Sequence, residues 1–266
     1  MSGEGPVRLL FGGAGAANAR VPRTGADAEG LTDAELLALY GPADRHVPRL
    51  RANFIASVDG SATSSGLSGE LGGPADRRIF DLLRQLCDVV IVAAGTIRSE
   101  GYGPMRLPTS AVAWRVANGL APQPAFAIVS GSLSLDPAST VFVDAPVRPL
   151  VVTADSADAG RRAELEAVAD VVSCGATTVE PARLVATLVD RGLPQMHCEG
   201  GPSLLGALIA ADVLDALCLT ISPSLEGGAG PRITHGPESI DLRALTLDHV
   251  LLASGMLLTQ YSRVRR

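Results

Sequence analysis

From residue 49 onward, short apolar runs alternate with stretches whose apolar residues recur at helical spacing. Pro74 opens one such stretch, and its apolar residues stand at i, i+3, i+4 and i+7 on one helix face: Ile79, Leu82, Leu83 and Leu86. The run that follows, residues 88–94, has the length and the β-branched composition of a strand buried on both faces. The sequence therefore predicts strands and helices in alternation.

The same patterns predict the remaining elements. Further strands are expected at residues 51–57, 125–130, 149–153, 195–198 and 214–222, and helices at 32–40, 157–168, 181–191 and 202–211. The last segment, 248–264, has two apolar runs around Ala253-Ser254-Gly255 and predicts a hairpin. Because such alternation builds a mostly parallel sheet with helices on both faces, we expect a three-layer α/β/α fold with a C-terminal antiparallel hairpin.

The apolar pattern weakens toward the N-terminus. Residues 1–45 are expected to form an N-terminal extension with one short helix, and residues 46–266 a single domain. A capping box from Thr32 to Glu35 marks the start of that helix.

The first 30 residues are rich in glycine and alanine. Residues 7–11 and the glycines after them imitate a dinucleotide fingerprint, but its third small residue falls on Asn18, and Pro22 interrupts the helix that should follow. The same stretch imitates a signal peptide, although Glu4 stands in its basic region and glycines dilute its apolar part. We therefore interpret residues 1–30 as a loose leader of a cytoplasmic protein.

Composition and charge exclude several classes of function. The chain has 266 residues, of which 47% are apolar, and a formal net charge of −6, so binding to nucleic acid or to an anionic membrane is not expected. All 22 basic residues are arginine, which excludes a lysine Schiff base and a P-loop lysine. No uncharged apolar run reaches membrane-spanning length, and the four cysteines form no CxxC pair, as is typical of buried, reduced thiols in the cytoplasm.

In a parallel α/β sheet, ligands bind at the carboxyl ends of the strands. The turn over residues 197–205 is the strongest candidate, because a buried strand breaks into Gly200-Gly201 and Pro202 starts a helix at once. Glycines admit a ligand close to the backbone, and a helix N-terminus offers unpaired N–H groups that suit a pyrophosphate. Glu199 reaches the same rim, where its carboxylate favours a heterocycle N–H as partner. A plain strand-to-helix turn is the alternative.

Three other strand ends carry weaker signals. Gly95-Thr96 leaves the strand at 88–94, and Ser130-Gly131-Ser132 offers hydroxyls to a ribose or its phosphate. Asp59-Gly60 precedes a loop at 64–73 that is long enough to cover a ligand. Each of these is also an ordinary turn or helix cap.

Charged residues add two possibilities. Arg84 and Arg106 are candidates for holding a phosphate or a carboxylate, although a solvated surface arginine is the default. His197-Cys198-Glu199 matches half of a zinc-deaminase signature, but the PCxxC half is missing, so no metal is expected.

Six short motifs occur in a characteristic order: SxDG at 57–60, SGLSG at 65–69, LLR ending at Arg84, DxVxVxxGT at 88–96, EGGPSLL at 199–205 and LxIxPxLxGG at 219–228. From about residue 51 to 264 the chain thereby resembles the reductase domain of the riboflavin-pathway pyrimidine deaminase/reductases. The resemblance implies a dihydrofolate-reductase-like fold, NADPH as cofactor, and reduction of a phosphoribosylamino-pyrimidine to its ribitylamino form. The deaminase half is absent, so a free-standing reductase is expected.

The resemblance also implies roles for the matched positions. The residues that would hold NADPH are Ala56, Gly95, Thr96, Glu100, Ser130, Gly200, Gly201, Pro202, Ser203, Leu204 and Leu205. The residues that would hold the substrate are Asn53, Ser68, Arg84, Arg106 and Glu199. Glu199 and Asp59 would act at the reacting centre. We expect hydride delivery to the C1′ carbon of the ring-opened ribose, with the protein positioning the reactants and excluding water.

The chain departs from the family pattern at three positions. Asn53 stands where lysine is frequent, Glu100 where aspartate is frequent, and Glu70 where an aromatic residue is frequent. The loss of a cation near the substrate leaves two alternatives open: a dihydrofolate-reductase-type activity on a pteridine, and a non-catalytic NADP-binding paralogue. Relatives with this fold are often dimers, and the apolar segment 214–221 suits a dimer interface and a core strand equally.

Overall fold

The computed structural model describes residues 5–13, 30–236 and 240–264. The strands are β1 (Arg8–Gly12), β2 (Arg49–Ser57), β3 (Val89–Ala93), β4 (Ala125–Val129), β5 (Leu150–Thr153), β6 (Asp170–Ser173), β7 (Gln195–Cys198), β8 (Ala216–Ser222), β9 (Leu245–Ala253) and β10 (Met256–Arg263). The helices are α1 (Asp33–Tyr40), α2 (Pro74–Leu86), α3 (Ala94–Glu100), α4 (Thr109–Ala117), α5 (Thr140–Val143), α6 (Ala159–Glu166), α7 (Pro181–Asp190) and α8 (Pro202–Ala210). The capping box predicted for α1 is present.

All the strands lie in one sheet, in the order β1-β9-β10-β8-β2-β7-β3-β4-β5-β6. From β8 to β6 every neighbouring pair is parallel, whereas β1, β9, β10 and β8 pair antiparallel. The β9–β10 hairpin turns at Ser254-Gly255, both with positive φ, as a two-residue turn requires. The predicted α/β fold, with its mostly parallel sheet and C-terminal antiparallel hairpin, is confirmed.

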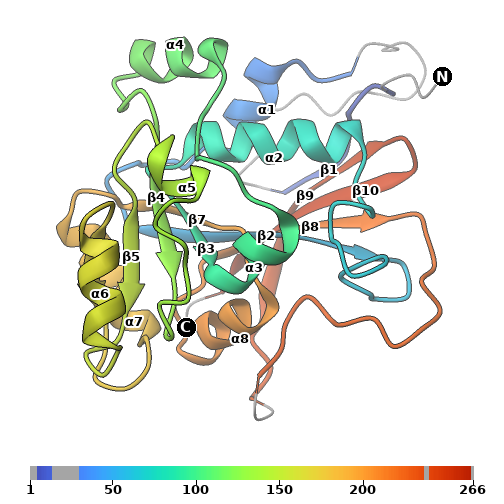
Figure 1. Cartoon of the computed structure of the whole chain (residues 1–266). Helices are drawn as coiled ribbons and strands as arrows, with labels where there is room; N and C mark the ends of the chain where they lie inside the picture. The colour runs from blue at the N-terminus through green and yellow to red at the C-terminus, as the bar shows by residue number, and fades with distance from the viewer. Residues whose placement is uncertain (1–4, 14–29, 237–239, 265–266) are drawn as a thin grey trace.

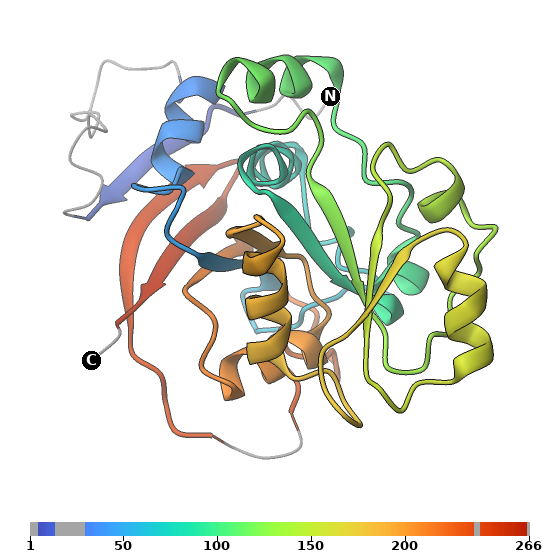
Figure 2. The same cartoon turned by 90° about the vertical axis from the view of Figure 1, so that its left-hand side faces the viewer.

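Helices cover the sheet on both faces (Figures 1 and 2). On one face, buried side chains of α7 and α8 pack on the central strands. On the other face, α1 and α2 pack on the antiparallel strands, and α3, α5 and α6 pack on β3, β4 and β5. The chain therefore leaves β3 and β7, which are neighbours, toward opposite faces of the sheet.

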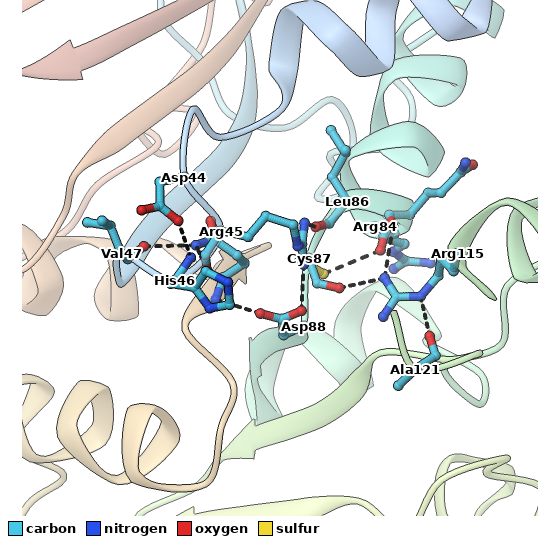
Figure 3. Close-up of polar contacts among 12 residues, drawn as sticks. Asp44, Arg45, His46, Val47, Arg84, Leu86, Cys87, Asp88, Arg115 and Ala121 are labelled. Carbon is cyan, nitrogen blue, oxygen red and sulfur yellow. Dashed lines mark hydrogen bonds and ion pairs between the residues drawn. The ribbon is translucent and has the colours of Figure 1, made fainter. Parts of the chain in front are cut away.

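Two arginines fasten the C-terminal end of α2 (Figure 3). Arg45 donates from Nη1 to the Leu86 carbonyl at 2.7 Å and from Nη2 to the Asp88 carboxylate at 2.6 Å. Arg115 is 1% exposed, and it donates to three backbone carbonyls, at 2.8, 2.6 and 2.7 Å: those of Gln85, Cys87 and Ala121. These contacts fix the helix that carries Arg84.

Part of the N-terminal segment forms a strand, where the sequence predicts a loose leader. Residues 8–12 form β1, which pairs antiparallel with β9 at the edge of the sheet, so a loose leader is wrong for them. Val7 and Leu9 are buried and Leu10 is exposed, but this alternation is too short to predict a strand beside so many glycines. Glu4 and residues 14–29, which the fingerprint and signal-peptide interpretations also use, lie outside the described residues.

Four further elements, α3, α4, α5 and β6, are not predicted from the sequence. α3 begins at Ala94, inside the run predicted as a strand over 88–94. α5 and β6 have four residues each, a length at which apolar periodicity is not visible. In α4 the buried residues are Ala111 and Arg115, and a buried arginine breaks the apolar pattern.

Other expectations concern the chain as a whole. Among the residues that the structure describes, no helix combines the length and apolarity needed to cross a membrane. The four cysteines are free and buried, as predicted. β8, considered for a dimer interface, is an internal strand in which every second residue is buried.

Candidate active site

A cleft of about 920 Å³ opens at the carboxyl ends of β2, β7 and β3. Just beyond the paired strands, the Glu199 N–H donates to Ile91 O at 3.0 Å, and the Ala93 N–H donates to Gly200 O at 2.7 Å. The chain then continues into α3 on one face and α8 on the other. A crevice at such a switch point is where open α/β sheets bind ligands.

Separate parts of the chain line this cleft. The lining includes residues 53–55 of β2, residues of the loop at 62–73, and one face of α2 from Pro74 to Arg84. Residues of the segment 96–105, Glu199 and Gly201-Pro202 complete it. The loop leads directly into α2, and α3 begins the 96–105 segment (Figure 1).

Arg84 and Glu199 form a bidentate ion pair in the cleft. Nε and Nη2 of Arg84 donate to the two carboxylate oxygens at 2.6 and 2.7 Å, and the Tyr102 hydroxyl donates to Oε2 at 3.0 Å. The Arg84 guanidinium lies 4.2 Å from the centre of the Phe80 ring and 5.6 Å from that of Tyr102, which adds cation–π attraction. The Glu199 side chain is 1% exposed and that of Arg84 19%, so water screens the pair only weakly.

The pair sets the protonation states around it. Burial lowers the pKa of Arg84, but the charge and hydrogen bonds of Glu199 outweigh it and raise this pKa above its ordinary value. Burial and the charge of Glu199 raise the pKa of Tyr102, so its hydroxyl keeps its proton. His197 lies 3.6 Å from Glu199, and burial lowers its pKa well below the ordinary value. Arg84 and Tyr102 are therefore the donors that hold the Glu199 carboxylate.

The Gly200-Gly201 turn is packed between two side chains. Gly200 has φ +98°, and a Cβ there would lie 3.0 Å from the Phe54 ring. A Cβ on Gly201 would lie 2.6 Å from Thr96 Oγ1. The physical reason for glycine here differs from the expected one, because neighbouring protein atoms already occupy the space that was attributed to a ligand.

Asp59 lies at the surface, outside the lining of the cleft. Its carboxylate accepts from the Ser57 hydroxyl and from the backbone N–H groups of Glu226 and Gly227. These hydrogen bonds, that of Ser57 above all, lower its pKa to about 2. In this structure Asp59 joins the end of β2 to the loop after β8.

The structure brings part of the expected site together. Expected residues that line the cleft are Asn53, Ser68, Arg84, Thr96, Glu100, Glu199, Gly201 and Pro202. Expected residues outside the lining are Ala56, Asp59, Gly95, Arg106, Ser130, Gly200, Ser203, Leu204 and Leu205. Of the latter, Gly95 and Ser130 follow the neighbouring strands β3 and β4, and Leu205 is fully buried in the core. The roles expected of all these residues stay predictions.

Two residues that were expected to contact a ligand form hydrogen bonds within the protein. Arg106 is exposed and donates to the Asp144 carbonyl at 2.8 Å. Glu100 accepts from the Ser68 backbone N–H at 2.9 Å and so ties the 62–73 loop to α3.

Among the cleft residues that sequence reasoning missed are Asp76, Arg77, Phe80 and Tyr102. The first three lie on α2 at positions that share a face with Arg84, opposite the predicted apolar face, so helical spacing could have found them. Tyr102 stands between two glycines in a segment without periodicity, and the sequence carries no signal for it.

The edge of the cleft, at the start of α8 and beyond β3 and β4, suits a dinucleotide cofactor in two respects. α8 begins at the cleft without a side-chain cap, so its first N–H groups are available to a phosphate. A Cβ added at Gly95 or Gly131 would meet nothing within 4 Å, so the backbone beyond β3 and β4 is open to a ligand. Within the described residues, no group of three His, Cys, Asp or Glu side chains is arranged to hold a metal ion.

Comparisons with known proteins agree with this geometry. The chain is 27% identical over 195 residues to 2,5-diamino-6-ribosylamino-4(3H)-pyrimidinone 5′-phosphate reductase of Methanothermobacter thermautotrophicus, an alignment covering 73% of this chain and 86% of that protein. It is 27% identical over 228 residues to the riboflavin biosynthesis protein RibD of Mycobacterium tuberculosis, covering 84% of this chain and 57% of that protein.

A solved structure shows the same fold. The pyrimidine reductase-like protein of Corynebacterium diphtheriae superposes with a TM-score of 0.81 at 28% identity, covering 89% of this chain and 100% of that one. The family model of the RibD C-terminal domain matches residues 48–258. The chain therefore belongs to the RibD C-terminal domain family, a reductase family of riboflavin biosynthesis, as its motifs predicted.

Proposed function

We propose that this chain is an NADPH-dependent reductase that converts 5-amino-6-(5-phosphoribosylamino)uracil to its ribitylamino form. The observation that supports this most is the Glu199–Arg84 pair in the crevice between β3 and β7, in a member of the RibD C-terminal domain family. A shielded carboxylate in a cleft of this size suits a heterocycle that presents N–H groups.

The residues beyond β7, β3 and β4 fit NADPH, which supplies a hydride when bound. The turn at Gly201-Pro202-Ser203 and the hydroxyl of Thr96 would hold its phosphates, and Ser130 would contact the 2′-phosphate. NADPH and NADH titrations measure that last role, and equal affinities would contradict it.

On the substrate side, Glu199 would accept a ring N–H of the pyrimidine. A carboxylate has about four acceptor sites, and Arg84 and Tyr102 fill three of them while holding it in one orientation. Asn53 and Ser68 also line the cleft and would contact the same ligand. The protein thereby contributes orientation and exclusion of water.

A second substrate is favoured by one specific observation. The chain matches 86% of the length of the Methanothermobacter enzyme, whose name gives a diaminopyrimidinone as substrate, but only 57% of RibD. The 2-amino group of that ring would give a carboxylate a further N–H donor. Turnover of the two pyrimidines, followed by NADPH oxidation, decides between them, and a lack of oxidation with both would contradict the proposed activity.

A pteridine reductase and a non-catalytic paralogue are distinguished in the same assay. A pteridine reductase would oxidise NADPH with dihydrofolate, and a non-catalytic paralogue would bind NADPH without turnover. We further propose a cytoplasmic location, supported by the four free buried thiols, and a homodimer, which light scattering tests.

A further inference from the structure

The Tyr102 hydroxyl lies in the cleft beside the Glu199–Arg84 pair, 3.0 Å from Glu199 Oε2. A carboxylate can only accept hydrogen bonds, so the hydroxyl directs its proton at Glu199. Burial and the charge of Glu199 raise the pKa of Tyr102, so this proton stays on the phenol oxygen. The hydroxyl can therefore offer a ligand only the lone pairs of its oxygen.

A ligand in the cleft reaches Tyr102 more fully than it reaches Glu199. The Glu199 side chain is 1% exposed, whereas Tyr102 is partly exposed and lines the cleft. Within the described part of the chain, the Tyr102 hydroxyl has no hydrogen-bond partner other than Glu199. The carboxylate therefore acts on a ligand in part through the hydroxyl that it orients.

The neighbouring polar groups define where the cleft accepts and where it donates. His197 Nε2 lies 3.6 Å from Glu199 Oε1, beyond hydrogen-bonding distance, so it does not take the remaining acceptor site of the carboxylate. Arg84 donates to Glu199 from Nε and Nη2, and among the described residues its Nη1 has no partner. Tyr102 and Glu199 thus offer acceptors side by side, and Arg84 offers N–H groups that suit a ring carbonyl.

We propose that Tyr102 determines which pyrimidine the cleft prefers, by accepting a hydrogen bond from a 2-amino group and disfavouring a 2-oxo group. In the diaminopyrimidinone ring, N3–H and the 2-amino group are adjacent donors, which match the acceptors of Glu199 and Tyr102. In the uracil ring, the C2 carbonyl would place its lone pairs against those of the Tyr102 oxygen. Both rings carry the C4 carbonyl, so Arg84 does not distinguish them. The assignment rests on the proposed reductase function and names the ring on which it acts.

The test compares the two phosphoribosylamino-pyrimidines, one with the 2-amino ring and one with the uracil ring, on the full chain. Calorimetry without NADPH gives the Kd of each, and NADPH oxidation gives each kcat/KM. The wild type should favour the 2-amino ring about 10-fold or more. Tyr102→Phe should lower this preference about 10-fold, mainly through weaker binding of the 2-amino ring. The control Tyr261→Phe, on β10 and outside the cleft lining, should keep the wild-type preference.

A hydroxyl that only held Glu199 in place would give a different result, because its loss would weaken binding of both rings alike. An unchanged preference in Tyr102→Phe, or a wild type that does not favour the 2-amino ring, would overturn the inference.

Turnover separates this failure from failure of the proposed function. A binding preference that depends on Tyr102, in a protein that oxidises NADPH with neither ring, would leave the recognition standing and remove the activity. Oxidation of NADPH with both rings at equal kcat/KM, in the wild type and in Tyr102→Phe, would keep the activity and remove the assignment of Tyr102.

Discussion

Replacing Glu199 by glutamine tests the ion pair at the centre of the cleft. The substitution preserves size but removes the charge, and it places an amide NH₂ against the donor fork of Arg84. Removing one partner of a buried ion pair costs about 3–5 kcal/mol, because the other charge is left uncompensated. Arg84 is 19% exposed and can recruit water, so we expect the lower end, about 3 kcal/mol of unfolding free energy.

Urea unfolding of Glu199→Gln measures this loss. The control is Asp170→Asn, since Asp170 pairs with Arg148 where both side chains are about half exposed, and such pairs contribute about 1 kcal/mol or less. Turnover of the phosphoribosylamino-pyrimidine should fall strongly in Glu199→Gln, while NADPH affinity stays near the wild-type value. Unchanged turnover would remove Glu199 from the reaction, and a stability loss no larger than that of the control would show that the pair is not effectively buried.

Three further predictions concern the frame of the site. Burial lowers the pKa of His249 to about 4, so the unfolded chain takes up a proton before the folded protein does as the pH falls. The free energy of unfolding should therefore decrease by up to about 3 kcal/mol between pH 6.5 and 4, measured by urea unfolding at each pH. The decrease should be smaller in His249→Phe. Gly95→Ala should keep or slightly raise the melting temperature, since its Cβ meets nothing, but weaken NADPH binding in calorimetry; unchanged affinity would place the cofactor elsewhere. Arg115→Met should cost about 3 kcal/mol or more in urea unfolding, since three carbonyls lose their donor, and a loss below 1 kcal/mol would contradict this.

Long apolar runs made most of the fold predictable. The buried run of β3 and the apolar face of α2 each extend over enough residues to show their period. β1 has the same length as β3 but lacks its continuous buried run, and α5 has only four residues, so both depend on the strands and helices that pack against them. Their conformation depends on tertiary packing, which a local pattern does not contain.

The candidate site was likewise predictable only in part. Motifs placed Glu199 and Thr96 near one another, because the ends of parallel strands meet at one edge of a sheet, and the resemblance added Arg84 from α2. The pairing itself joins residues 115 positions apart, and the Tyr102 bond joins residues 97 apart, so neither is visible in local spacing. The glycine turn shows the opposite case, since the residues were identified correctly but the atoms that require glycine belong to Phe54 and Thr96.

The most direct measurement is the near-ultraviolet absorbance of NADPH mixed with the purified chain and the phosphoribosylamino-pyrimidine. We expect a steady decrease that requires both the pyrimidine and the protein, and that is lost in Glu199→Gln. An absorbance that stays constant with both pyrimidine substrates, while the protein remains folded, would contradict the proposed reductase activity.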